Sequence, residues 1–141
     1  MTQKEFIDST NRFFQSHNFI RKGRKFAFEL NDMFVVFVLL KSYYCDCYYI
    51  DYNISLKELH KEFDFSDKCF DIILRPRLTL ADGKVQLKPE EMENDEYINA
   101  LQPTVTKLLD KISADGVKFL KRLQKQGFVI EKEAMEAIAK K

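Results

Sequence analysis

Apolar residues repeat at helical spacing near the start of the chain. Thr2 and Glu5 have the spacing of a capping box, in which each side chain bonds to the backbone of the other residue. The apolar residues that follow lie on one helical face: Phe6, Ile7, Phe13 and Phe14. This pattern predicts an N-terminal helix that ends near His17 and Asn18.

Strand patterns fill the next part of the chain, from residue 26 to residue 87. Residues 26–30 and 48–54 alternate between apolar and polar, and residues 33–40 form a continuous apolar run. The continuous run predicts a central strand covered on both faces. Shorter apolar segments at 70–74, 78–80 and 85–87 predict further strands, the last two joined by a turn at Asp82 and Gly83.

Helical spacing returns after Pro89. Residues 98–112 predict a helix that contains Pro103, and Asp115 is placed to cap a second helix that ends near Gly127. A short helix over residues 134–138 completes the chain. Strands joined by short turns must be antiparallel. We therefore predict one α+β domain over residues 1–141: an antiparallel sheet of about five to six strands, with an N-terminal helix and two to three C-terminal helices packed on it.

Composition and charge narrow the function classes. The chain has 23 Lys and Arg against 22 Asp and Glu, so its net charge of +1 disfavours a dedicated nucleic-acid-binding domain. The polar N-terminus does not resemble a signal peptide, and an apolar run of eight residues is too short to cross a membrane. We expect a cytoplasmic protein without a membrane partner. Three cysteines, an odd number, fit reduced thiols better than a disulfide scaffold.

Four residues are the candidate ligands for a metal: Cys45, Cys47, His60 and Cys69. Structural zinc sites take four ligands and usually pair cysteines with two to four residues between them. Here one residue separates Cys45 from Cys47, and no second pair follows. Buried thiols that pack as small apolar groups are the favoured interpretation. A disulfide between Cys45 and Cys47 is disfavoured if both lie in a strand, where their side chains stand too far apart. No metal and no cofactor are expected.

Catalysis is also disfavoured. The chain has two histidines, His17 at the end of the first helix and His60 in a predicted surface turn, and neither lies in a catalytic motif. No glycine-rich phosphate-binding loop is present in the sequence. We expect that the protein is not an enzyme.

A basic turn precedes the first predicted strand, with Arg21, Lys22, Arg24 and Lys25 around Gly23. Such a cluster next to aromatic residues can hold phosphates while bases stack on the rings. Four charges in a turn are more often a solvated sheet edge, where lysine prevents aggregation. The turn is a candidate partner-binding segment, with nucleic acid the disfavoured partner.

Tyrosines gather around the third strand: Tyr43, Tyr44, Tyr48, Tyr49 and Tyr52. A strand with tyrosine on both faces cannot bury every ring unless each hydroxyl finds a partner. Some rings are therefore expected at a surface or in a cleft, and tyrosine is enriched where proteins recognise partners. The alternative is that a helix covers one face and the other hydroxyls reach water.

The segment over residues 17–28, with Asn18–Phe19 before the basic turn and an aromatic strand after it, resembles a bacterial family known as domain of unknown function 4304. The strand-rich middle and residues 115–120 are similar to that family as well. The resemblance implies a bacterial α+β domain of about this length. It implies structural roles for Phe19, Gly23 and Phe26, and it implies no catalytic residues.

The leading hypothesis is a non-enzymatic module that presents tyrosines and the basic turn to a protein partner. By analogy, some small bacterial domains of this kind neutralise toxins. A second hypothesis is a small-molecule-binding domain with an aromatic pocket between the sheet and the helices. Weak nucleic-acid binding through the basic turn is the third.

Overall fold

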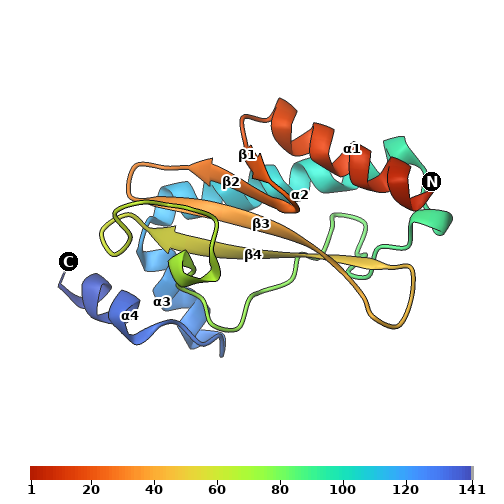
Figure 1. The fold of residues 1–141 in the computed structure, drawn as a ribbon. Helices are drawn as coiled ribbons and strands as arrows, with labels where there is room; N and C mark the ends of the chain where they lie inside the picture. Colours follow the sequence, from red (N-terminus) through yellow and green to blue (C-terminus); the bar gives the residue numbers. More distant parts are fainter. Residues whose placement is uncertain (141) are drawn as a thin grey trace.

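A computed structural model describes residues 1–140, and the secondary-structure elements follow in the predicted order. Helix α1 comes first, a sheet of four strands follows, and three helices end the chain (Figure 1). The elements are α1 (Gln3–Ser16), β1 (Ile20–Lys22), β2 (Lys25–Glu29), β3 (Met33–Lys41), β4 (Tyr48–Leu56), the 3-10 turns η1 (Asp67–Cys69) and η2 (Pro89–Glu91), α2 (Asn94–Asp115), α3 (Lys118–Lys125) and α4 (Lys132–Ala139). The α+β class, the N-terminal helix and three C-terminal helices are confirmed.

The predicted capping box begins α1. The Glu5 N–H donates to Thr2 Oγ1 at 3.1 Å, and the Thr2 N–H donates to Glu5 Oε1 at 3.2 Å. The helix ends one residue before His17. Gly23 has a positive φ of 61° in the turn between β1 and β2, a conformation that glycine adopts without a steric penalty.

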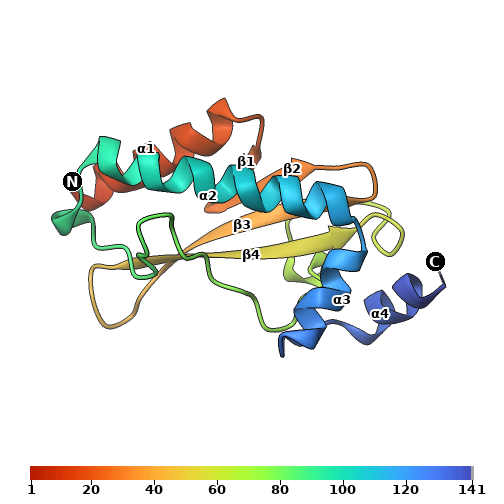
Figure 2. The same cartoon turned by 180° about the vertical axis from the view of Figure 1, so that it is seen from behind.

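The sheet has the order β1-β2-β3-β4, and all neighbouring strands are antiparallel. Helices α1 and α2 lie side by side over one face, as the two opposite views show (Figures 1 and 2). Aromatic rings fill the space between them and the sheet, and the rings of Phe14 and Phe26 stack with centroids 4.4 Å apart. Fully buried aromatic side chains such as these contribute much of the burial free energy of a core.

The second face of the sheet is covered by the chain between β4 and η2, residues 57–88. This stretch contains only the 3-10 turn η1 and is called the irregular segment below. Alternate β3 residues, among them Val36 and Val38, pack there with Phe70 in a second apolar cluster. Phe63 stacks on Phe34 with ring centroids 4.5 Å apart. Strand β3 is therefore central and covered on both faces, as its continuous apolar run predicts.

The prediction of five to six strands is wrong, because the sheet has four. Segments 70–74, 78–80 and 85–87 form no ladder with β4: Leu87 bridges Tyr48 and Arg77 bridges Asp51, whereas Ile72 bridges Ile130. The Leu78 N–H donates to the Ile50 carbonyl at 2.8 Å, and the Tyr52 N–H donates to the Pro76 carbonyl at 3.0 Å. Pro76 has no N–H to donate, so a regular ladder cannot continue through it. The predicted turn does form, with Gly83 at a φ of 88°.

Asn53 supplies the contacts that a fifth strand would have made. Its Nδ2 donates to the Ile72 carbonyl at 2.9 Å, while its Oδ1 accepts from the N–H groups of Ile72 at 3.0 Å and Ile54 at 2.8 Å. The Asn53 side chain is almost wholly buried. One amide therefore satisfies three backbone groups that would otherwise be buried without partners.

Residues 71–73 also bond to the connection between α3 and α4. On their far side from β4, the Ile73 N–H donates to the Val129 carbonyl at 2.8 Å, and the Glu131 N–H donates to the Asp71 carbonyl at 2.8 Å. Residues 71–73 thus lie between β4 and the connection from α3 to α4.

Asp115 does not cap α3, contrary to the prediction. It is the last residue of α2, and its Oδ2 pairs with Arg122 Nη1 of α3 at 2.6 Å. The turn between the two helices is made by Gly116, which has a positive φ of 58°. Within residues 1–140, no helix combines the length and the apolar character that crossing a membrane requires.

We predict that Asn53→Ala lowers the free energy of unfolding by about 2–4 kcal/mol, because it leaves buried backbone groups of Ile54 and Ile72 unpaired. Urea unfolding measures the change. Asn31→Ala, an exposed asparagine in the turn before β3, is the matched control and should stay within about 0.5 kcal/mol of the wild type. Equal stability of the two variants would contradict the role given to Asn53.

Candidate functional site

The five candidate tyrosines separate into three environments. Tyr48 and Tyr52 project from β4 toward the helices and belong to the main core. The Tyr48 hydroxyl donates to Gln3 Oε1 at 2.8 Å, which anchors the start of α1 to the sheet. Even-numbered residues of β4 face the core, so these two rings do not belong to an exposed surface.

Tyr49 projects to the opposite face of the sheet and is half-buried. The Arg77 guanidinium lies over its ring, 4.0 Å from the centroid, and Gln86 Nε2 donates to its hydroxyl at 3.0 Å. Both partners come from the irregular segment along the edge of β4. Tyr49 therefore helps to hold that segment on the sheet.

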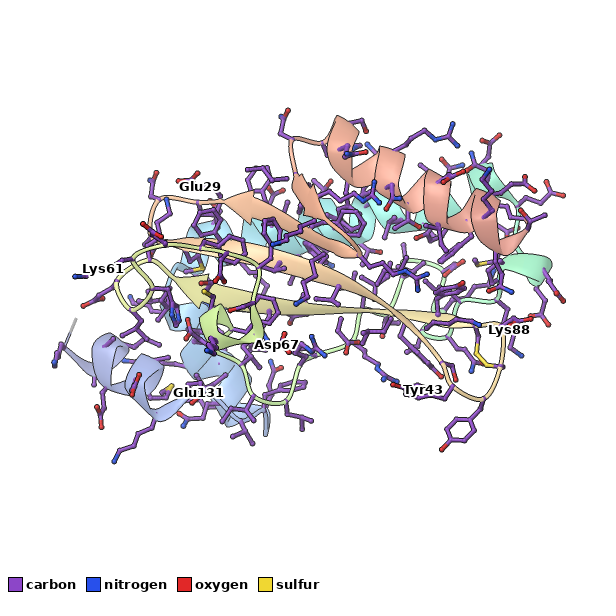
Figure 3. The ribbon with its side chains drawn as sticks, viewed as in Figure 1. Glu29, Tyr43, Lys61, Asp67, Lys88 and Glu131 are labelled. Atoms are coloured by element: carbon purple, nitrogen blue, oxygen red, sulfur yellow. A yellow bond between two sulfur atoms is a disulfide. The ribbon has the colours of Figure 1, made fainter. Side chains whose placement is uncertain are left out.

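Tyr43 and Tyr44 are fully exposed. They lie in the connection between β3 and β4, residues 42–47, which is called the tyrosine loop below. Tyr43 points away from the body of the molecule at the tip of this loop (Figure 3). These two adjacent exposed rings form an apolar surface, and contiguous exposed apolar surface is typical of interaction sites.

Two polar contacts hold the tyrosine loop closed at its base, and a disulfide constrains its second half. The Ser42 N–H donates to the Cys47 carbonyl at 2.9 Å, and Lys41 Nζ pairs with Asp46 Oδ1 at 3.4 Å. Cys45 and Cys47 form a disulfide, with their Cα atoms 5.3 Å apart. The loop is therefore constrained by covalent and polar contacts while its two rings reach solvent.

The prediction that Cys45 and Cys47 are reduced is wrong. It assumed that both residues lie in a strand, where side chains two residues apart are too far from each other to bond. The chain bends at residues 43–46 instead, and β4 begins only at Tyr48. Cys69, the third cysteine, is free and buried.

The four candidate metal ligands have other partners. Cys69 donates to the Glu62 carbonyl at 3.7 Å, and His60 Nε2 lies 2.7 Å from Asp71 Oδ1. Throughout residues 1–140, there is no group of three or more His, Cys, Asp and Glu side chains placed to hold a metal ion.

The basic turn lies at the same end of the sheet as the tyrosine loop. The Leu39 N–H donates to the Arg24 carbonyl at 2.9 Å, only two residues before β3 ends. The Arg24 guanidinium carbon is 5.9 Å from the centroid of the Tyr48 ring. The turn and the loop can therefore contact one partner together.

The four basic residues differ in their surroundings. Lys25 is half-buried; its Nζ donates to the Phe65 carbonyl at 2.8 Å and pairs with Asp67 at 3.3 Å. Arg21, Lys22 and Arg24 are exposed, and none of them has an ion-pair partner in the described part of the chain. The unbalanced positive charge of the turn comes from these three residues.

Sequence reasoning missed a buried polar group beneath the irregular segment. Asp51, Asn53 and Ser55 of β4 face that segment and are buried, as is Asp71. In the sequence these polar residues of β4 alternate with apolar residues, a pattern that predicts a strand with one face exposed to solvent. They are buried because the irregular segment covers that face.

His60 does not lie free in a surface turn as expected, since it is paired with Asp71. The Leu56 N–H donates to the other Asp71 oxygen at 2.7 Å, so both carboxyl oxygens are occupied by contacts that hold the fold.

Burial raises the pKa of Asp71 above its ordinary value of 3.8, although the bonds from Leu56 and His60 act in the opposite direction. The negative charge of Glu131 raises it further. The native state therefore binds a proton at Asp71 more tightly than the unfolded chain does.

Comparison of the chain with protein-family models, curated protein sequences and solved structures found no match. The resemblance to domain of unknown function 4304 stays a prediction.

We predict one titratable thiol in protein purified without reductant and then denatured, because Cys45 and Cys47 are bonded and Cys69 is free. Reduction before the assay should raise the number to three. A colorimetric thiol assay in guanidinium chloride measures both values. Three thiols without reduction would contradict the disulfide.

We predict that the stability advantage of the wild type over Asp71→Asn falls as the pH rises above 3.8, the ordinary value of the carboxyl pKa, because the pKa of Asp71 is raised in the native state. A carboxyl with a raised native pKa contributes its stability below the unfolded value and loses it as the pH passes the native value. Urea unfolding at increasing pH measures the difference. The comparison is repeated in the His60→Gln background, because the His60 ring is paired with Asp71. An advantage that grows with pH would show that the native pKa is lowered instead.

Proposed function

We propose that the protein is a non-enzymatic interaction module that binds a protein partner through the tyrosine loop and the neighbouring basic turn. The observation that carries the proposal is the full exposure of Tyr43 and Tyr44 on a loop that is closed by the bond between Ser42 and Cys47 and stiffened by the adjacent disulfide. Tyrosine rings are frequent binding hot spots, since they bury a large area with few rotatable bonds.

The constraint on the loop favours recognition. Binding fixes flexible segments, and the conformational entropy lost in doing so weakens the complex. The Cys45–Cys47 bond and the contact between Ser42 and Cys47 limit the conformations of the loop before any partner arrives. A loop with a restricted backbone loses less entropy on binding than an open one.

The charge of the turn indicates the chemistry of the partner. Arg21, Lys22 and Arg24 form no ion pair within residues 1–140, and they lie at the same end of the sheet as the loop. We infer a partner with an apolar pocket for the tyrosine rings and acidic side chains at its rim. Such complementary charges increase the association rate. Neutralisation of a bacterial toxin is one activity that binding of this kind would serve.

We predict that a photo-crosslinking amino acid at position 43 captures one protein partner in the source cells and that the same amino acid at position 73 does not. Ile73 is also exposed and apolar, but it lies in the segment next to α4, away from the loop. Affinity is then measured with the purified partner by calorimetry. Tyr43→Ser/Tyr44→Ser should weaken binding by about thirtyfold or more, the loss expected for one hot spot of about 2 kcal/mol.

Ile73→Ser/Leu74→Ser is the matched control, since it removes two exposed apolar side chains elsewhere and should leave affinity unchanged. Tyr43→Ser/Tyr44→Ser should change stability by less than about 0.5 kcal/mol, so a loss of binding is not a loss of fold. Equal affinity of the two double variants would overturn the proposal. Crosslinking to RNA in place of protein would support the nucleic-acid hypothesis instead.

A further inference from the structure

A groove lies between α2 and the irregular segment. The tyrosine loop contributes no residue to its lining. Its volume is about 590 Å³, within the range of small-molecule sites. Leu78, Pro103 and Leu108 contribute apolar surface to it. The Ala81 N–H reaches the Ala100 carbonyl at 3.5 Å and so tethers the segment to α2 beside the groove.

Three cations line the groove, and none of the residues that line it is acidic. Lys107 and Lys111 stand one turn apart on α2, where two like charges destabilise a helix slightly. Neither lysine forms an ion pair within residues 1–140. The third cation is Arg77, whose Nε pairs with Asp51 at 3.2 Å while half of its side chain stays exposed. The groove therefore carries the positive charge of Lys107 and Lys111, which no described residue neutralises in an ion pair.

Tyr52 is an independent observation that points to a ligand in the same place. It lines the groove, and only 7% of its surface is exposed. A buried tyrosine hydroxyl normally has a hydrogen-bond partner, as those of Tyr48 and Tyr97 do, with Gln3 and Thr10 respectively. The Tyr52 hydroxyl forms no hydrogen bond within residues 1–140 and is not among the side-chain oxygens fully shielded from solvent there, so it opens into the groove, where a ligand can reach it. Burial raises the pKa of Tyr52 to about 12, so the hydroxyl keeps its proton and can donate it.

We propose that this groove binds a small organic anion with an apolar ring. Lys107 and Lys111 attract the anionic group, the Tyr52 hydroxyl donates a hydrogen bond to it, and the ring packs on the apolar surface of the groove. This site would make the protein a ligand-binding module in addition to its proposed interaction through the tyrosine loop.

The fluorescent probe 8-anilinonaphthalene-1-sulfonate tests the proposal, since it joins a sulfonate to an apolar ring system. Its neutral counterpart N-phenyl-1-naphthylamine lacks the sulfonate and serves as the uncharged comparison. We predict saturable binding of one sulfonate probe to the folded protein. Lys107→Gln/Lys111→Gln should weaken it by about tenfold or more and leave the neutral probe unaffected. Tyr52→Phe should weaken it by about fivefold, the equivalent of about 1 kcal/mol for one hydrogen bond.

The matched control is Lys121→Gln/Lys125→Gln, which removes two exposed lysines at the same spacing from α3. It changes net charge by the same amount and should leave both probes unaffected. Circular dichroism and cooperative urea unfolding verify that each variant is folded, because the sulfonate probe also binds partly unfolded proteins. Any of three results overturns the proposal. These are no saturable binding of the sulfonate probe, an equal loss of affinity for it in the two lysine double variants, or an unchanged affinity for it in Tyr52→Phe.

Discussion

The amide of Asn53 joins β4 to a chain segment that has no regular structure of its own. The outer edge of β4 would otherwise expose unpaired N–H and C=O groups, as every edge strand does. Asn53 bonds to both backbone groups of Ile72, and Asp71 accepts from the Leu56 N–H. These contacts place residues 71–73 where the connection between α3 and α4 bonds to them in turn. The connection between α3 and α4 is therefore bonded to the sheet through residues 71–73 and a pair of buried polar side chains.

The irregular segment also reaches both surfaces that we propose for binding. Gln86 donates to Tyr49 and to Cys47 Sγ at 3.3 Å, next to the tyrosine loop. Arg77 lies over Tyr49 and lines the groove on the side of α2. A regular fifth strand would have presented alternate side chains to two flat faces, whereas an irregular chain can direct these side chains to separate sites. The irregular course of this segment thus explains both why no fifth strand forms and how its side chains reach both sites.

Features set by local spacing could be predicted from the sequence. The capping box of α1, the three longer strands, the turn at Gly83 and the C-terminal helices follow from residue patterns within about ten positions. The extra strands could not be excluded, because Ile72 and Leu78 have strand-like neighbours and only their partners decide whether a ladder forms. Tyr48 and Tyr52 could not be separated from Tyr43 and Tyr44 until the end of β3 was known. The groove joins residues from β4, the irregular segment and α2, and no local pattern connects them.

Hydrogen exchange at the outer edge of β4 tests the dependence on Asn53 most directly. The N–H groups of Tyr52, Ile54 and Leu56 point away from β3 and are held by Pro76, Asn53 and Asp71. We predict that these amides, and that of Ile72, exchange as slowly as the β4 amides that bond to β3. In Asn53→Ala, the amides of Ile54 and Ile72 should lose this protection while those facing β3 keep theirs. Rapid exchange of Ile54 and Ile72 in the wild-type protein would contradict the account, because the irregular segment would then not be bound to the sheet.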